Sequence, residues 1–144
     1  MADAVGEMYS SAADDAFLVW NLVPVRLSYG HDLAVLLDDL VPLLEKIRRP
    51  GFSDDEVFWG SDTFSAEWGI VRKGDSLRIR ARWHSILGSY ESLLAERGDV
   101  VVPVGEFIGE WVKVLRRIVT DINAEHVELE DDDLFRRAEA LLAA

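Results

Sequence analysis

The sequence predicts an α+β fold in which an antiparallel sheet packs against amphipathic helices. Two observations indicate this class. Residues 62–86 hold two stretches in which apolar and polar residues alternate, and four other segments repeat apolar residues at helical spacing. Strands and helices occur in clusters along the chain, which favours an antiparallel sheet. The 144 residues are enough for one well-buried core, so we expect a single domain over residues 1–144 with a polar leader of about 1–14.

A central β-hairpin, at about residues 62–86, is the clearest element. Gly74-Asp75 suits a two-residue type II′ turn, because glycine accepts the positive φ that the first turn position requires. That turn fixes which residues face one another across the strands. It predicts a buried face with Ile70 opposite Ile79, Trp68 opposite Ala81, and Ala66 opposite Trp83. It predicts an outer face with Glu67 opposite Arg82, Gly69 opposite Arg80, and Ser65 opposite His84.

The remaining elements follow from spacing and from turn residues. Residues 16–22 and 25–29 are rich in aromatic and β-branched residues and are predicted as strands, although 16–22 could instead be helical. Helices are predicted at about 32–49, 89–97, 106–122 and 131–142. Pro42 falls inside the first helix and should bend it. Residues 100–104 indicate a short edge strand because they contain Pro103.

Composition excludes several classes of function. The 27 acidic and 15 basic side chains give a net charge of −12, which disfavours nucleic acid as a partner and favours a basic protein. Cysteine is absent, so disulfides and thiolate chemistry are excluded and a reducing cytoplasm is compatible. The N-terminal residues lack the basic region of a secretory signal, and the apolar runs are too short to cross a membrane. We therefore expect a cytoplasmic protein that does not enter the membrane.

The local motifs of common enzymes are missing. The sequence contains no glycine-rich phosphate loop, no HExxH, no GxSxG and no EF-hand spacing. His31, His84 and His126 lie far apart without ligand-like spacing, so each is interpreted as a surface or capping residue. We expect no catalytic residue, no metal and no cofactor.

Four cationic side chains line the outer face of the predicted hairpin: Arg78, Arg80, Arg82 and His84. Alternate residues on one face of a strand lie about 7 Å apart, so neighbouring charges repel by roughly 0.6 kcal/mol in water. One interpretation is a solvated face neutralised by Glu67 and by acids from elsewhere in the chain. The other is a site that recognises an acidic group, since the guanidinium fork suits carboxylate and phosphate.

Acidic residues gather in two stretches that are candidates for binding a basic partner. The first is Asp54, Asp55 and Glu56, and the second runs from Asp121 to Asp133 without a single Lys or Arg; its candidate contact residues are Glu125, Glu128, Glu130, Asp131, Asp132 and Asp133. Solvation and helix capping would also account for such runs. Trp59, beside the first stretch, is a candidate interface anchor if it is partly exposed, whereas Trp68, Trp83 and Trp111 are expected in the core.

The segments EVFWGSDTFSAEWGIVRKGDSLRIRARW (56–83) and VGEFIGEWVKVLRRI (104–118) combine a tryptophan-bearing hairpin with a helix that carries a Phe-x-x-x-Trp face. In this pattern, which spans about half the chain, the sequence resembles small acidic cytoplasmic immunity proteins of bacterial toxin systems. The resemblance implies a protein that binds and blocks a cognate toxin without catalysis of its own. It transfers no individual functional residue.

The leading hypothesis is therefore a non-enzymatic binding protein that neutralises a basic bacterial toxin domain through its acidic stretches. The alternative is a small-molecule or anion-binding enzyme that uses the face of Arg78, Arg80, Arg82 and His84, with Glu67 or His84 as acid or base. A third hypothesis is a homo-oligomeric structural component, such as a homodimer.

Overall fold

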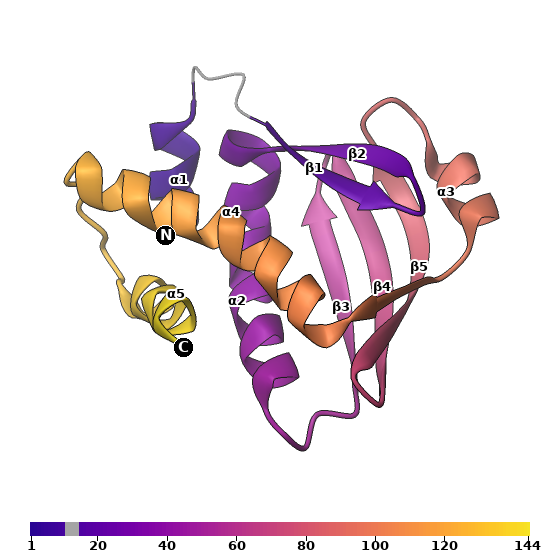
Figure 1. Ribbon diagram of the computed structural model, residues 1–144. Coiled ribbons are helices and arrows are strands. Elements are labelled where there is room, and N and C mark those ends of the chain that lie inside the picture. Colours follow the sequence, from indigo (N-terminus) through magenta and orange to yellow (C-terminus); the bar gives the residue numbers. More distant parts are fainter. Residues whose placement is uncertain (11–14) are drawn as a thin grey trace.

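The computed structural model describes residues 1–10 and 15–144, and these form the expected α+β fold (Figure 1). The helices of the described residues are α1 (Ala2–Met8), α2 (Ala34–Arg48), α3 (Glu91–Arg97), α4 (Val104–Ala124) and α5 (Asp133–Ala143), and a π-helical turn, η1 (Tyr29–Leu33), leads into α2. The strands are β1 (Asp15–Trp20), β2 (Val23–Ser28), β3 (Asp54–Ser61), β4 (Phe64–Lys73), β5 (Ser76–Ile86) and β6 (Val100–Pro103).

Strands β3, β4, β5 and β6 form one antiparallel sheet in that order. The central hairpin β4–β5 has the predicted pairs Ile70 with Ile79, Trp68 with Ala81, and Glu67 with Arg82. Gly74 adopts a φ of +61°, and Asp75 is not among the residues with positive φ, as a type II′ turn requires. Both the turn and the register inferred from the sequence are therefore confirmed over most of the hairpin.

The register changes near the end of the hairpin. Ala66 faces Trp83, as predicted, but the next residue, Ser65, faces Ser85 instead of His84. His84 is thus the extra residue of a β-bulge, and the predicted pairing of Ser65 with His84 is wrong. A bulge inserts one residue into one strand without a periodic signal in the sequence, so alternation alone could not reveal it.

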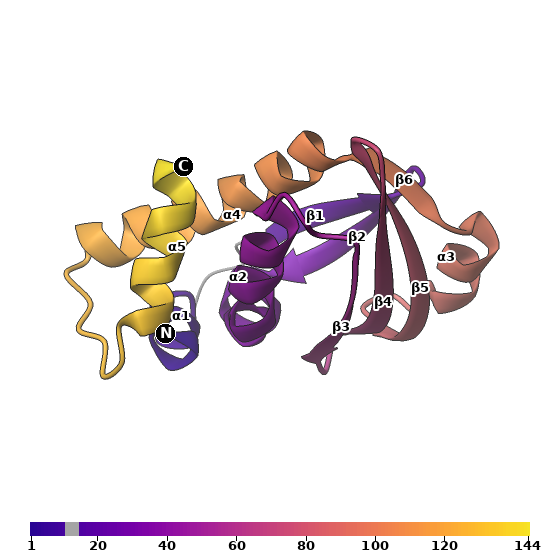
Figure 2. The same ribbon diagram turned by 90° about the horizontal axis from the view of Figure 1, so that it is seen from below.

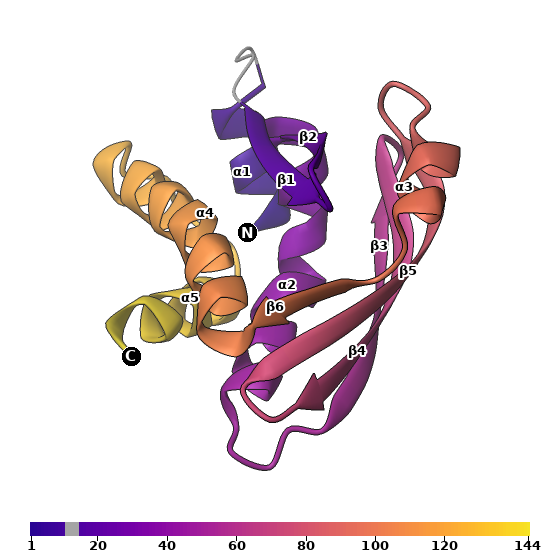
Figure 3. The ribbon, with the colours of Figure 1, turned by 45° about the vertical axis from the view of Figure 1, so that its right-hand side comes forward.

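Strands β1 and β2 form a separate two-stranded sheet joined by Asn21 and Leu22. Residues 16–22, which could have been helix, are therefore strand followed by a turn. Trp20 packs this hairpin against the inner face of the larger sheet. Its ring centre lies 5.4 Å from that of Trp68 and 5.0 Å from that of Trp83. Figure 3 shows the β1–β2 hairpin beside the larger sheet, with β6 crossing below it toward α4.

Helix α2 is central in all three ribbon views, between α5 on one side and the larger sheet on the other (Figures 1, 2 and 3). Its apolar residues are buried nearly all round, which is typical of an interior helix; they are Ala34, Leu36, Leu37, Leu40, Val41, Leu43, Leu44 and Ile47. Pro42 lies inside the helix, where it removes one backbone hydrogen bond.

A buried carboxylate, Asp32, joins the two sheets to the start of this helix. One oxygen accepts the backbone N–H of Ser28, at the end of β2, at 2.8 Å. The other accepts the hydroxyls of Ser61 and Thr63, at the turn between β3 and β4. Three donors thus compensate for the burial of Asp32, which is only 2% exposed.

The N-terminal residues contribute to the core, which corrects the expectation of a polar leader. Val5 on α1 is fully buried, and Tyr9 packs 5.2 Å from the ring of Tyr29. Burial raises the pKa of Tyr9, and the hydrogen bond that its hydroxyl donates to Asp121 raises it further. Residues 11–14 of the predicted leader lie outside the described residues.

Candidate functional site

The outer face of β5 presents the predicted cations to solvent. Arg80 and Arg82 are the most open, each with 78% of its side chain exposed, while Leu77 and Ile79 point into the core. The alternation of one apolar and one cationic face is therefore as predicted. The decisive question is whether these cations are balanced within the chain.

Two carboxylates lie beside this row and partly neutralise its three arginines. Asp99, just before β6, accepts a 3.0 Å hydrogen bond from Arg78 and lies 3.7 Å from Arg80. Glu67, on β4, lies 2.8 Å from the ring nitrogen of His84 and 3.7 Å from Arg82. Each acid lies beside two neighbouring side chains of the row, which reduces the repulsion between the arginines. The geometry favours the interpretation of a solvated face that acids of the same chain partly neutralise.

A shallow hollow of about 460 Å³ lies on the same outer face. Gly69 lies among the residues that line it, and a Cβ added there would touch no neighbouring atom within 4 Å. Charged and aromatic side chains surround that glycine: Glu56, Phe58, Glu67, Arg80 and Arg82. Because glutamates and arginines both line it, the hollow is neither a purely negative nor a purely positive pocket.

The first acidic stretch is part of the sheet. Asp54, Asp55 and Glu56 are the first three residues of β3, and Asp55 forms a 3.1 Å ion pair with Lys46 on α2. The second stretch lies at the other side of α2, between α4 and α5, as Figure 2 shows. The two stretches therefore do not form one continuous acidic surface.

Within the second stretch, some acids have partners and others do not. Asp121 accepts from Tyr9 and pairs with Arg117. Asp132 and Asp133 pair with Arg136 and Arg137, one turn further along α5, and the hydrogen bond from Arg136 lowers the pKa of Asp132. Four exposed acids form no ion pair with any other described residue: Glu125, Glu128, Glu130 and Asp131. We call residues 125–131 the acidic connector.

Trp59 is not the exposed anchor that the sequence suggested. It is fully buried, and its ring lies 5.4 Å from Trp68 and 6.0 Å from Trp111. Its neighbour Phe58 points outward instead and is 55% exposed. Adjacent residues of a strand face opposite sides of the sheet. The exposed aromatic residue beside the first acidic stretch is therefore Phe58, and the candidate role of Trp59 as an interface anchor is wrong.

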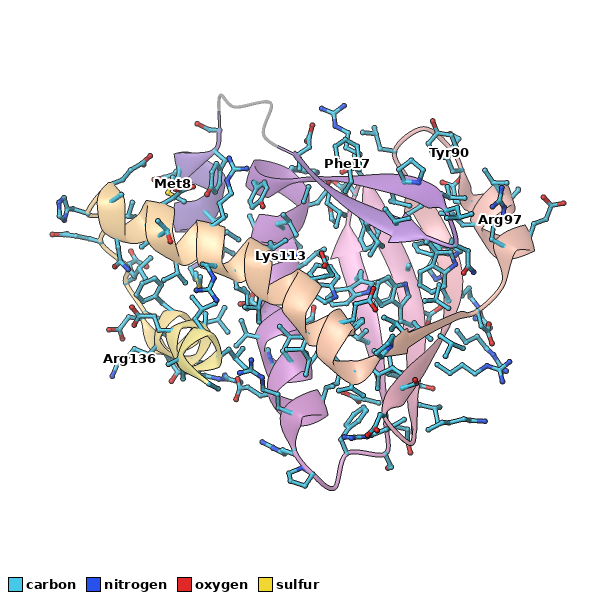
Figure 4. All side chains as sticks on the ribbon, viewed as in Figure 1. Met8, Phe17, Tyr90, Arg97, Lys113 and Arg136 are labelled. Atoms are coloured by element: carbon cyan, nitrogen blue, oxygen red, sulfur yellow. The ribbon has the colours of Figure 1, made fainter. Side chains whose placement is uncertain are left out.

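Sequence reasoning missed an apolar groove of about 460 Å³. Five consecutive residues of β1, Ala16 to Trp20, form one wall, and the N-terminal half of α4 forms the other. Trp68, Ile79, Val100 and Val102 line the groove between these walls. Figure 4 labels Phe17 and Lys113, one on each wall. One signal in the sequence could have indicated it. Residues 17 and 19, which alternate with Leu18 and Trp20 and so face the other side of the strand, are also apolar.

Among residues 1–10 and 15–144, no group of three or more His, Asp or Glu side chains is placed to hold a metal ion. None of the helices in this described part of the chain has the length and apolar character needed to cross a membrane. No protein family matches the chain, and no curated protein or solved structure matches it either.

Proposed function

We propose that this protein is a non-enzymatic binding module that docks on a basic partner through the acidic connector. The observation that supports this proposal is the set of four exposed carboxylates without an ion-pair partner among the described residues: Glu125, Glu128, Glu130 and Asp131. The C-terminal end of α4 lies beside them and adds the negative end of its helix dipole. This part of the surface therefore carries uncompensated negative charge.

The contrast with the arginine row favours this surface over the outer sheet face. Asp99 and Glu67 form ion pairs with the arginines of the row. No described residue forms an ion pair with the connector acids, although Asp131 accepts the backbone N–H of Asp133 at 2.9 Å. Uncompensated surface charge raises association rates and disfavours partners of like charge. A basic protein gains both effects at the connector, and it also benefits from the net charge of −12 on the whole chain.

The partner that we propose is a bacterial toxin domain, which this protein would neutralise in the cytoplasm. The resemblance of residues 56–83 and 104–118 to immunity proteins suggests this class, and the basic character of the partner follows from the charge of the connector. Blocking a toxin needs only a stable complex, so no catalytic group is required on this chain.

The test is a cross-linked pull-down from the native cell, followed by affinity measurement with the recovered partner at several salt concentrations. We expect the affinity to fall as salt rises, because the complex depends on opposite charges. A variant with Glu125→Gln, Glu128→Gln, Glu130→Gln and Asp131→Asn should lose most of that salt dependence. The matched control neutralises four exposed acids elsewhere: Asp3→Asn, Asp62→Asn, Glu96→Gln and Glu139→Gln. Equal effects of the two variants, or an affinity independent of salt, would contradict the proposal.

A second candidate function is an enzyme or receptor for a small anion at the hollow around Gly69. The pair of Glu67 and His84, 2.8 Å apart beside Arg82, is the observation that favours it, because such a pair could move a proton. Thermal-shift measurements with phosphate, citrate and acetate would test it. Stabilisation that disappears in Arg80→Ala would promote this function above the first.

A further inference from the structure

Strand β1 differs from every other edge strand of the described sheets. β3 begins with three acids, β6 is four residues long and ends at Pro103, and β2 contains Pro24 and Arg26. Charges, prolines and short length are the devices that keep a sheet edge from pairing with another chain. β1 begins with Asp15, which pairs with Arg26 of β2, but the residues that follow, Ala16 to Trp20, carry no charge and no proline. No described strand lies on the open side of β1.

The hairpin register tells which backbone groups of β1 remain open. In a hairpin with a two-residue loop, the pair next to the loop, Trp20 and Val23, exchanges hydrogen bonds, and the following pair does not. Val19 therefore faces Pro24 in a pair without hydrogen bonds, which suits a residue that has no N–H. The backbone N–H and C=O of Val19, and by the same alternation those of Phe17, point away from β2.

This open edge runs along the apolar groove. All five residues from Ala16 to Trp20 line the groove, although successive side chains of a strand point to opposite faces. Such continuous lining is expected when the edge of the strand, rather than one of its faces, borders the space. An occupant of the groove would thus meet backbone donors and acceptors on one side and apolar side chains of α4, such as Phe107 and Trp111, on the other.

The mouth of the groove is negatively charged. Glu106, Glu110 and Lys113 of α4 line it, and Lys113 is engaged by Glu110 at 2.8 Å. Glu106 is exposed and forms no ion pair with another described residue. The preferred occupant therefore carries apolar side chains and at least one cation.

The hairpin is held rigidly at its tip. The side-chain amide of Asn21 donates to the carbonyl oxygens of Arg97 and Asp99 at 2.9 and 3.0 Å, and Arg97 donates back to the Asn21 carbonyl at 3.0 Å. Figure 4 labels Arg97 on α3, close to the end of the hairpin. A fixed edge binds with a smaller loss of conformational entropy than a mobile one.

We propose that the groove binds an extended apolar segment of a partner protein, which adds to β1 as a third strand and directs a Lys or Arg side chain toward Glu106. Main-chain hydrogen bonds to Phe17 and Val19 would supply affinity, and the groove would select the alternate side chains of the segment. A second copy of this chain is a poorer occupant, because it has the same charge of −12 and the same acidic groove mouth. This surface is separate from the acidic connector, so the proposal does not depend on the toxin hypothesis.

The probe is a phage-displayed library of random 12-residue peptides, selected on the wild-type protein. We expect enriched peptides to alternate apolar residues and to carry a Lys or Arg. A synthetic, fluorescein-labelled copy of the best binder should lose about tenfold or more in affinity with Val19→Lys, which places a charge on the open edge. The matched control is Val101→Lys on edge strand β6, where the valine is similarly exposed; it should change the affinity by less than about twofold.

Two further measurements keep the result decisive. Circular dichroism checks that Val19→Lys is folded, and Phe17→Lys replaces it if it is not. Hydrogen exchange should show protection of the Phe17 and Val19 amides when the peptide binds. The proposal would be overturned if no peptide is enriched, if binders tolerate both β1 variants, or if those two amides gain no protection. It would also be overturned if the wild type is a dimer that Val19→Lys converts to a monomer, because a second copy would then occupy the groove.

Discussion

The two hairpins of this protein differ in the residues that they present to solvent. The β4–β5 hairpin turns at Gly74 and separates an apolar face from a charged face whose arginines pair with Glu67 and Asp99. The β1–β2 hairpin turns at Asn21 and Leu22, and its outward residues Phe17 and Val19 are apolar and more than half exposed. Polar outward residues are solvated on a sheet face, whereas exposed apolar residues are typical of surfaces that bind another molecule, which supports the docking that we propose for β1.

The largest effect is expected at Trp59, which tests whether the larger sheet uses its inner face only for the core. Trp59→Ala should lower the free energy of unfolding by about 3–5 kcal/mol, because it removes a fully buried aromatic ring. Phe58→Ala, one residue away on the outer face, should cost much less. Chemical denaturation of the two variants makes the comparison, and similar losses would contradict the assignment of the faces.

The next largest effect is expected at Asp32, the residue that joins the end of β2 to the turn between β3 and β4. Asp32→Ala leaves the backbone N–H of Ser28 and two hydroxyls without their acceptor, so we expect a loss of about 3 kcal/mol. Asp32→Asn retains an acceptor and should lose less. Urea unfolding followed by tryptophan fluorescence measures both. A neutral result for Asp32→Ala would show that water replaces this carboxylate.

Gly30 gives a steric test of the way α1 meets the turn that follows β2. A Cβ at position 30 would lie 2.8 Å from the backbone oxygen of Tyr9, so one of the two segments would have to move. We expect Gly30→Ala to destabilise the protein by about 1–3 kcal/mol. Gly51→Ala is the control, since a Cβ there meets nothing within 4 Å. Thermal unfolding of both variants would decide whether α1 is docked as described.

The turns themselves give the smallest effects, and these have opposite signs. Gly74→Ala should destabilise by about 1 kcal/mol, because alanine disfavours the φ of +61°. Leu22→Gly should be neutral or stabilise by up to about 1 kcal/mol, because leucine at a φ of +71° is already strained. Leu22 is 86% exposed, so little packing is lost. A clear destabilisation by Leu22→Gly would show that this leucine has a structural role.

The prediction from sequence was most complete where periodicity and turn chemistry agreed. The alternation around Trp68 and Ile79, with the glycine between the strands, predicted the register of β4–β5 without tertiary information. The same reasoning failed at His84, because a bulge has no periodic signal. It also failed at Trp59, because the acids beside it suggested an exposed position although its side chain points to the inner face of β3.

The candidate site was less predictable than the fold. The acids of the connector could be identified in the sequence, but whether Glu125 or Asp132 has an ionic partner depends on which arginine lies one helical turn away. The groove was invisible, because its walls come from β1 and α4, which are about 90 residues apart in sequence.

The sequence by itself determined the fold class, the central hairpin and the helices α2 to α5, because these depend on local spacing of apolar residues and on glycine at a turn. Only the tertiary structure decided which charges are paired, that Trp59 is buried and where a strand edge stays open. Those properties depend on the distance between residues far apart in the chain, such as Arg78 and Asp99 or Phe17 and Lys113, and local spacing carries no information about that distance.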